Sequence, residues 1–510
     1  MRIVSFMPAQ PRRACATLAC ALALALSAPS AMAAAAPTAK RDDFYWLGEF
    51  NKASTVMTVE QGIVPRELGG KIARAVAQVI EQGDQPGGKR PNDYLRLEPL
   101  ITAIAGPDAT RMHSGRSRQD ILATTRRVML RDRLLDLADA LDEARARMDT
   151  LAARYANDIV PAYTNGVQAQ PTTYGHYLLG FSAALARDAQ RLHEAYARLN
   201  LSPMGSAALG TSSFPIDRKR LADLLGFDGV AENSYDANQV SQIDIGAEAA
   251  SLASTMALTV GAFVQDVHTQ YHQPRPWLML QEGKLTGTSS IMPQKRNPYA
   301  LNVTRLQASD TVGEAITALM VAHNVTPGMP DYKRSQAQDA VDAAVDMYGK
   351  LGAMLDGLVL NPQRALEEVD ADYSTTTELA DVLQREADVP FRIGHHFASD
   401  LVTYGRQNGL KPSQLPYAEA QRIYTEAAKS FGIQDAKLPL AEARFRQTLT
   451  AQNMVVSSKG LGGPQPAEVA RMLKAAQAAL QADRKWAQDA RGRLAAAQGR
   501  LDEAFGKLAR

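Results

Sequence analysis

Nine residues near the middle of the chain collect groups that could remove a proton beside a carboxylate. Ser289 to Asn297 contains two adjacent hydroxyls, two cations and two amides. A serine hydroxyl ionises far above neutrality, so it acts as a base only where a cation and hydrogen-bond donors stabilise the alkoxide. Lys295 can supply the cation, and Asn297 and backbone N–H groups can supply the donors. The same donors could hold a substrate carboxylate while charge moves onto its oxygens.

A second polar stretch, Arg111 to Asp120, directly precedes a predicted long helix. The stretch combines small residues, arginines and an amide. Such groups at a helix start form a surface that can bind carboxylates. The alternative interpretation is a basic helix-capping loop without a role in binding.

The elements that must position these stretches are helices. Gly and Pro are absent from residue 116 to residue 160, and apolar residues recur there at spacings of three and four. This pattern predicts one helix of roughly 40 residues, about 60 Å long. Such a rod cannot bury its apolar stripe alone, so it implies a bundle rather than an isolated helix. Further helices are expected over 174–200, 243–273, 298–322 and 467–510, and strand-like alternation is nearly absent. The predicted fold class is all-α with a central bundle of long helices.

The N-terminus has the pattern of a secretory signal peptide. Basic residues precede an apolar core over residues 14–28, and Ala31-Met32-Ala33 has the form of a cleavage site. We expect a periplasmic or secreted protein that has no membrane segment once residues 1–33 are removed. Arg12-Arg13 leaves twin-arginine export open as an alternative to the general pathway.

Charge and cysteine content exclude several other classes. The net charge of +2 gives no electrostatic case for nucleic-acid binding. Both cysteines, Cys15 and Cys20, lie within the predicted signal peptide, so the mature chain would have no disulfide and no cysteine-ligated metal. His268 and His272 have a spacing that can bind zinc, but no third ligand is evident nearby. We therefore expect no metal.

The chain resembles the fumarase/aspartase superfamily, and argininosuccinate lyase most of all. Residues 289–297 match the superfamily pattern Ser-Ser-x-Met-Pro-x-Lys-x-Asn throughout. Residues 113–120 resemble the lyase pattern His-Thr-Gly-Arg-Ser-Arg-Asn-Asp. Residues 164–171 resemble Thr-His-x-Gln-x-Ala-Gln-Pro. The resemblance implies a fumarase/aspartase-like three-domain fold, a homotetramer with composite active sites and no cofactor. The layout suggests an N-terminal domain over 34–116, a central helical domain over 117–371 and a C-terminal helical domain over 372–510.

The resemblance also implies roles for individual residues. Ser289 would take the β-proton, and Lys295 and Thr164 would act with it. Asn165 stands at the position of a histidine often assigned to proton handling. The implied substrate-binding residues are Ser117, Arg118, Gln119, Gln170, Asn297, Asn302 and Tyr332.

Two of these positions depart from the lyase pattern together. Asn165 replaces the histidine, and Asn302 replaces the glutamate that pairs with it in the pattern Asn-Pro-Asp-Ser-Leu-Glu. Two amides can satisfy each other by hydrogen bonding, but neither titrates near neutrality. Another group must therefore protonate the leaving atom, unless the leaving group needs little help.

The half of the predicted site that holds fumarate is kept, whereas the half that holds the amine is rebuilt. Tyr332 remains, but the glutamine and lysine of the lyase pattern become Ala337 and Ala340. We predict a carbon–nitrogen lyase of the amidine-lyase type, which eliminates an amine from an N-substituted aspartate, argininosuccinate or a related compound, and releases fumarate. The alternatives are a C–O lyase or cycloisomerase of the same superfamily, and an inactive binding or structural homologue.

Overall fold

The computed structural model describes residues 41–329 and 336–510. The predicted signal peptide and Tyr332 lie outside these residues. Helices dominate the described chain, which confirms the all-α prediction. Arg41 to Arg510 forms one unit.

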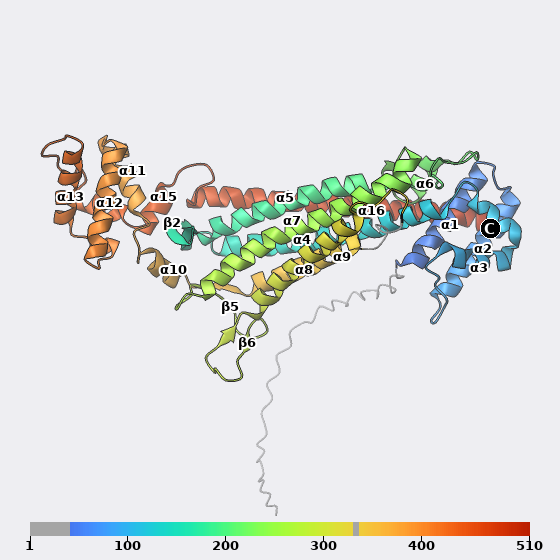
Figure 1. The fold of residues 1–510 in the computed structure, drawn as a ribbon, viewed down its shortest axis with the longest axis horizontal. Helices are drawn as coiled ribbons and strands as arrows, with labels where there is room; N and C mark the ends of the chain where they lie inside the picture. Colours follow the sequence, from blue (N-terminus) through green and yellow to red (C-terminus); the bar gives the residue numbers. More distant parts are fainter. Residues whose placement is uncertain (1–40, 330–335) are drawn as a thin grey trace, which may run out of the picture. The chain divides into compact units, whose positions relative to one another are not determined.

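The predicted long helix is α4, Arg118–Arg154, which has 37 residues. Its apolar stripe is buried against α5 (Tyr174–Leu199) and α9 (Gln336–Asp356), while α7 (Ser241–Tyr271) and α8 (Tyr299–Ala322) complete the bundle. Figure 1 shows these helices running side by side. Because each helix presents apolar residues at helical spacing, the bundle buries a continuous core that none of them could bury alone.

Two further cores lie outside the bundle. The first joins α1 (Asp43–Glu60), α2 (Arg66–Asp84) and α3 (Tyr94–Ala105). The second joins α11 (Thr376–Ala387), α12 (Phe391–Gln407), α13 (Tyr417–Ser430) and α14 (Glu442–Thr448). The last helix, α16 (Pro466–Ala509), packs on α4, α5, α1 and α2 rather than on this second core. The expected domain boundaries at 116 and 371 stay a prediction.

The strands are short and form two-stranded sheets that carry loops. β1 (Ile159–Thr164) pairs with β2 (Val167–Thr173), and β6 (Gly287–Thr288) pairs with β7 (Arg296–Asn297), both antiparallel. β3 (Leu201–Ser202) pairs with β4 (Gly229–Val230), and β5 (Leu278–Leu280) pairs with β8 (Leu358–Leu360). The remaining elements are η1 (Pro107–His113), α6 (Arg218–Leu224), η2 (Asp236–Val240), α10 (Pro362–Val369), η4 (Pro412–Gln414) and α15 (Ala451–Ser457).

One described segment, Asp236–Tyr271, is long and apolar enough to cross a membrane by length and composition. Half of its most apolar window is buried inside the protein, and α7 contributes Ala253, Met256 and Val264 to the bundle core. This is the pattern of a core helix in a bundle.

Candidate functional site

The stretch before α4 is built around a buried carboxylate. Ser117 is the N-cap of α4, and its hydroxyl accepts a hydrogen bond from the Gln119 N–H at 3.2 Å. Asp120 accepts from the N–H of Ser117 at 2.8 Å and from that of Gly205 at 2.9 Å. Burial raises the pKa of Asp120 to about 7, and these N–H groups partly oppose the shift. Asp120 therefore fixes the position of Ser117.

The arginines of this stretch are largely engaged by the protein itself. Arg116 is buried and donates to Asn51 Oδ1 and Ser54 Oγ, both at 2.9 Å, which ties the loop to α1. Burial and the adjacent Arg116 lower the pKa of His113 to about 3, so its Nδ1 accepts from Arg116. Arg118 remains half-exposed and forms an ion pair with Asp93 at 2.5 Å. The positioning role of Arg116 was not foreseen, because its partners on α1 are distant in sequence.

Thr164 and Asn165 lie at the exposed tip of the β1–β2 hairpin. Asn165 has φ 53° and Gly166 has φ 77°, and Thr164 pairs directly with Val167. A two-residue turn with positive φ at both residues favours the sequence Asn-Gly. The geometry of the turn therefore accounts for an asparagine at position 165 independently of any role in catalysis.

The predicted binding residue Gln170 is exposed on β2. It lines a cavity of about 540 Å³ together with His176 and Gly462. His176, at the start of α5, bonds Gly462 O and Thr172 Oγ1, both at 2.8 Å. Gln168 was not predicted as a site residue, and it donates to Val369 O and Ser374 Oγ.

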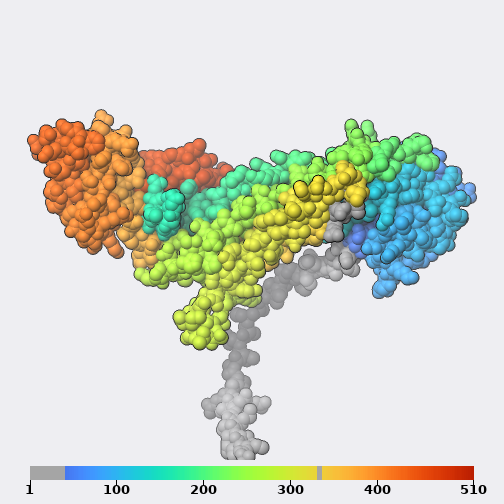
Figure 2. Space-filling view, viewed as in Figure 1, coloured from blue at the N-terminus to red at the C-terminus, as the bar shows by residue number. Residues whose placement is uncertain are grey.

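Ser289 follows β6 in a loop that projects from the bundle surface (Figure 2). Its Oγ accepts from the N–H of Met292 at 3.1 Å and from that of Ile291 at 3.4 Å. Donors directed at this oxygen lower the cost of the alkoxide, as a serine base requires. Lys295 is exposed and forms no ion pair within the described chain.

Two neighbours of the serine hold the loop in shape. Arg296 pairs with Glu282 at 2.9 Å and donates to Pro293 O at 2.9 Å. The Asn297 amide donates to Thr288 O at 3.4 Å across the β6–β7 pair. The sequence therefore folds locally into a closed loop that displays Ser289 and Lys295.

Asn302 is exposed on the first turns of α8. Among the hydrogen bonds of the described residues, none joins Asn302 to Asn165. A single chain therefore does not form the expected amide pair, and the pairing stays a prediction for an assembly.

The two positions that the sequence comparison assigns to the amine side, Ala337 and Ala340, have no polar side chain. Ala340 is fully buried in the bundle core, and Ala337 packs near Gly246 of α7. Neither position can supply a polar group to a substrate. In the described part of the chain, no group of three His, Cys, Asp or Glu residues could hold a metal ion, and His268 and His272 stack with ring centroids 5.7 Å apart.

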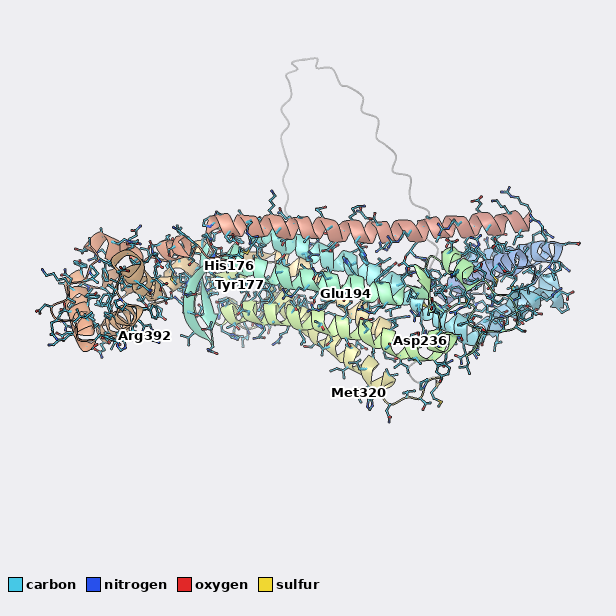
Figure 3. The ribbon with its side chains drawn as sticks, turned by 90° about the horizontal axis from the view of Figure 1, so that it is seen from above. His176, Tyr177, Glu194, Asp236, Met320 and Arg392 are labelled. Carbon is cyan, nitrogen blue, oxygen red and sulfur yellow. The ribbon has the colours of Figure 1, made fainter. Side chains whose placement is uncertain are left out.

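One chain does not gather all three stretches. Ser117 begins α4, whereas Thr164 lies in the hairpin that starts five residues after α4 ends. A helix of 37 residues is about 55 Å long at 1.5 Å per residue. Figure 3 shows the same separation, with His176 beside the hairpin and Asp236 toward the other end of the bundle.

The Ser289 loop joins the bundle at the end where the β1–β2 hairpin lies. It lies between β5 and α8, and Asn361 after β8 donates to Trp277 O, just before β5, at 2.8 Å. The Leu360 N–H also donates to the hydroxyl of Tyr155, the C-cap of α4, at 3.3 Å. A site that contains Ser117 together with Thr164 therefore needs more than one copy of the chain.

Comparisons with known proteins agree with this architecture. The profile of the family described as Lyase matches residues 74–313, and that described as Argininosuccinate lyase C-terminal matches residues 373–456. Argininosuccinate lyase from Methanothermobacter thermautotrophicus is 31% identical over 447 residues, which cover 86% of this chain and 93% of that protein. The enzyme of the same name from Methanosarcina barkeri is 32% identical over 442 residues, with 85% and 87% covered.

Solved structures give the same result. The crystal structure of EDDS lyase in complex with formate is 29% identical, has a TM-score of 0.81 and covers 92% of both chains. Fumarate lyase from Mesorhizobium sp. BNC1, at 19% identity and a TM-score of 0.66, shares the fold. The relationship suggested by the three motifs is thereby confirmed. The chain belongs to the argininosuccinate lyase family.

Proposed function

We propose that the protein is a carbon–nitrogen lyase that removes an amine from an N-substituted aspartate by anti β-elimination and releases fumarate. The Ser289 loop carries this proposal. Its hydroxyl oxygen accepts two backbone N–H bonds and lies in the same exposed loop as the cation of Lys295. The names of the curated relatives support a C–N lyase over a C–O lyase or a cycloisomerase.

In the proposed reaction Ser289 takes the β-proton, and charge moves onto the substrate carboxylate. When this charge returns to form the C=C bond of fumarate, the C–N bond breaks and the amine leaves with the bonding electron pair. Lys295, Asn297, Thr164 and Ser117 hold the two carboxylates and stabilise this intermediate. The proton removed is very weakly acidic, so charge stabilisation must supply much of the rate enhancement. Neither Asn165 nor Asn302 can act as a general acid, because an amide does not titrate near neutrality.

The proposed enzyme is a homotetramer whose sites each combine stretches from different subunits. Support comes from the length of α4, which places Ser117 about 55 Å from the hairpin that carries Thr164. It also comes from exposed apolar side chains on the bundle, namely Leu258, Leu306, Ile316 and Met320, of which Met320 is labelled in Figure 3.

The sequence of residues 1–33 supports export to the periplasm or beyond. Arginine synthesis is a cytoplasmic process, so an exported enzyme fits the breakdown of an external N-substituted aspartate better. Sequencing the N-terminus of the exported protein should find Ala34 as the first residue. A full-length N-terminus in the cytoplasmic fraction would contradict the proposal.

The central experiment follows fumarate by its ultraviolet absorbance. The mature protein is incubated with argininosuccinate in one direction and with fumarate plus a panel of amines in the other. Formation or loss of fumarate supports the proposal. A folded protein that is stabilised by fumarate but turns over none of these compounds would instead indicate an inactive binding homologue.

A further inference from the structure

The loop between β3 and α6, residues 203–217, contains two backbone conformations that its residues do not favour. Ala207 has φ 53° and Thr211 has φ 59°, so both lie in the left-handed region without being glycine. A positive φ is uncommon for residues with a side chain, and for a β-branched residue such as threonine it is an outlier. Such conformations persist only where the surrounding structure holds them, and they cluster at functional sites. Contacts with the rest of the protein must therefore hold this β3–α6 loop in place.

A buried amide on η2 supplies such contacts. The Nδ2 of Asn238 donates to the carbonyl oxygen of Ala207 at 2.5 Å and to that of Ala208 at 3.0 Å. Asn238 is only 1% exposed, so water has little access to its amide. η2 begins at Asp236, which is labelled in Figure 3, and forms one π-helical turn, an arrangement that is frequent at functional sites. One side chain thus fastens the strained part of the loop.

The β3–α6 loop is joined through Asp120 to the Ser117 loop, residues 114–119. One carboxylate oxygen of Asp120 accepts from the N–H of Gly205 at 2.9 Å, and the other accepts from that of Ser117 at 2.8 Å. The N–H groups of Gly205 and Ala207 both oppose the rise in the pKa of Asp120 that burial causes. Movement of Ala207 would therefore disturb the carboxylate that fixes Ser117.

A second contact joins the same two loops. A Cβ added to Gly115 would lie 2.7 Å from Ser212 Oγ, so the β3–α6 loop packs directly against the Ser117 loop at this glycine. Ser212 follows the strained Thr211, whose N–H donates to Ser206 O at 3.2 Å. The Ser117 loop therefore depends for its position on the β3–α6 loop beside both strained residues.

We infer that Asn238 is a positioning residue for the proposed reaction, which holds the Ser117 loop in place through the β3–α6 loop and Asp120. The inference rests on the proposed function, in which Ser117 holds a substrate carboxylate. Asn238 acts through the loop rather than by touching the substrate, because its side chain is buried. Its Oδ1 is also buried and accepts no hydrogen bond from the described residues. Removing the amide therefore acts first on the β3–α6 loop.

The test compares the binding of fumarate to the mature wild-type protein and to Asn238→Leu by calorimetry. Leucine has a similar size but no donor, and it also removes the unsatisfied Oδ1, so the melting temperature should change little. The Kd for fumarate should rise at least about tenfold, because Ser117 loses its position against one carboxylate. Asn238→Ala, which is too small to clash with its surroundings, should raise the Kd in the same way.

Further substitutions trace the path of the effect. In a Ser117→Ala background, Asn238→Leu should change the Kd by less than about twofold, because the group that it positions is already gone. Ala207→Gly should restore the Kd of Asn238→Leu to within about threefold of the wild-type value, because glycine adopts a positive φ without being held. Ser234→Ala is the matched control, since it removes a hydrogen bond to Leu209 O of the same loop, at 2.9 Å, and should leave the Kd unchanged.

A Kd for fumarate within about twofold of the wild-type value in Asn238→Leu overturns the inference and leaves the proposed lyase activity in place. A rise that persists undiminished in the Ser117→Ala background also overturns it, because the effect then does not pass through Ser117. Unfolding of both Asn238→Leu and Asn238→Ala would assign the residue to folding and overturn the inference as well. A wild-type protein that neither binds fumarate nor releases it from argininosuccinate overturns the proposed function and the inference with it.

Discussion

Ser289 differs from its neighbour Ser290 in what its oxygen contacts. The Ser289 Oγ accepts the N–H groups of Ile291 and Met292, so its lone pairs are held by donors that would stabilise an alkoxide. This difference makes the adjacent hydroxyl a matched control.

We predict that Ser289→Ala lowers turnover by about 10²-fold or more, which is the usual contribution of a positioned base. Ser290→Ala should retain most of the activity. Fumarate release measures both, and circular dichroism and gel filtration should show unchanged helicity and assembly. Retention of more than a few per cent of activity in Ser289→Ala would remove this residue from the role of base.

The stability of the folded chain depends on whether the Asp120 carboxyl is protonated. Burial raises its pKa to about 7 in the folded chain, above its ordinary value of 3.8. A raised folded-state pKa means that the protonated form is favoured by folding. Its contribution to stability is therefore complete below about pH 4 and is lost as the pH rises through about 7.

We predict that Asp120→Asn flattens the dependence of unfolding free energy on pH between about 4 and 7. The variant should also be about 1–3 kcal/mol less stable at the acidic end, because one backbone N–H loses its acceptor. Urea unfolding across this pH range measures both effects. Asp108→Asn, at an exposed position, serves as the control, and an equal slope in the two variants would contradict the prediction.

At the scale of elements, the loop before α4 is fixed by a glycine with no room for a side chain. Gly115 has φ +66°, and an added Cβ would lie 2.6 Å from Ile216 Cγ1 and 2.7 Å from Ser212 Oγ. Gly106 has a similar φ of +79°, but its Cβ would meet nothing within 4 Å. Alanine substitutions at Gly115 and at Gly106 therefore distinguish the effect of backbone strain from the effect of displacing the loop.

Gly115→Ala and Gly106→Ala should both lose about 1–3 kcal/mol of stability, because both backbones have a positive φ that an alanine rarely adopts. Only Gly115→Ala should also raise the KM for the dicarboxylate, since its clash displaces the loop that carries Ser117. Thermal unfolding and steady-state kinetics measure the two effects. Equal KM values in the two variants would show that the loop position does not control binding.

Asn165 has a place both in the geometry of the β1–β2 turn and in the predicted site. Its φ of 53° favours Asn or Gly, while its place at the exposed tip makes it available to a neighbouring subunit. Asn165→Gly keeps the turn and removes the amide, so any loss of activity in it reports on the side chain.

We predict that Asn165→His alone does not raise turnover, because Asn302 cannot orient the imidazole. The double variant Asn165→His with Asn302→Glu should depart from the sum of the single effects by more than about 0.5 kcal/mol. The kcat values of the four enzymes measure this coupling. Effects that add within that margin would show that the two positions act independently.

At the scale of the whole molecule, the spacing of the stretches predicts complementation between inactive variants. If Ser117 and Thr164 enter each site from different subunits, hybrid tetramers of Ser117→Ala and Thr164→Ala contain some sites with neither substitution. Mixed oligomers should therefore regain part of the wild-type activity. Hybrids of Ser289→Ala and Lys295→Ala should not, because both residues lie in one loop. No recovery in verified Ser117–Thr164 hybrids would contradict the composite site.

The sequence alone determined the fold class and the family, and it identified the Ser289 loop as the candidate for the chemistry. Helical spacing identified α4 to within a few residues of its length, because a helix that buries one face must repeat its apolar residues. The Ser289 loop was recognisable because its groups lie within nine consecutive residues. Functional groups that lie close together in the sequence can be recognised without a structure.

Tertiary structure decided what depends on contacts between distant residues. It showed that Arg116 is tied to Asn51 and Ser54 of α1, that Asn165 satisfies a turn, and that Asn302 has no bond to it in one chain. These features arise from packing and backbone geometry, which no single stretch of sequence contains.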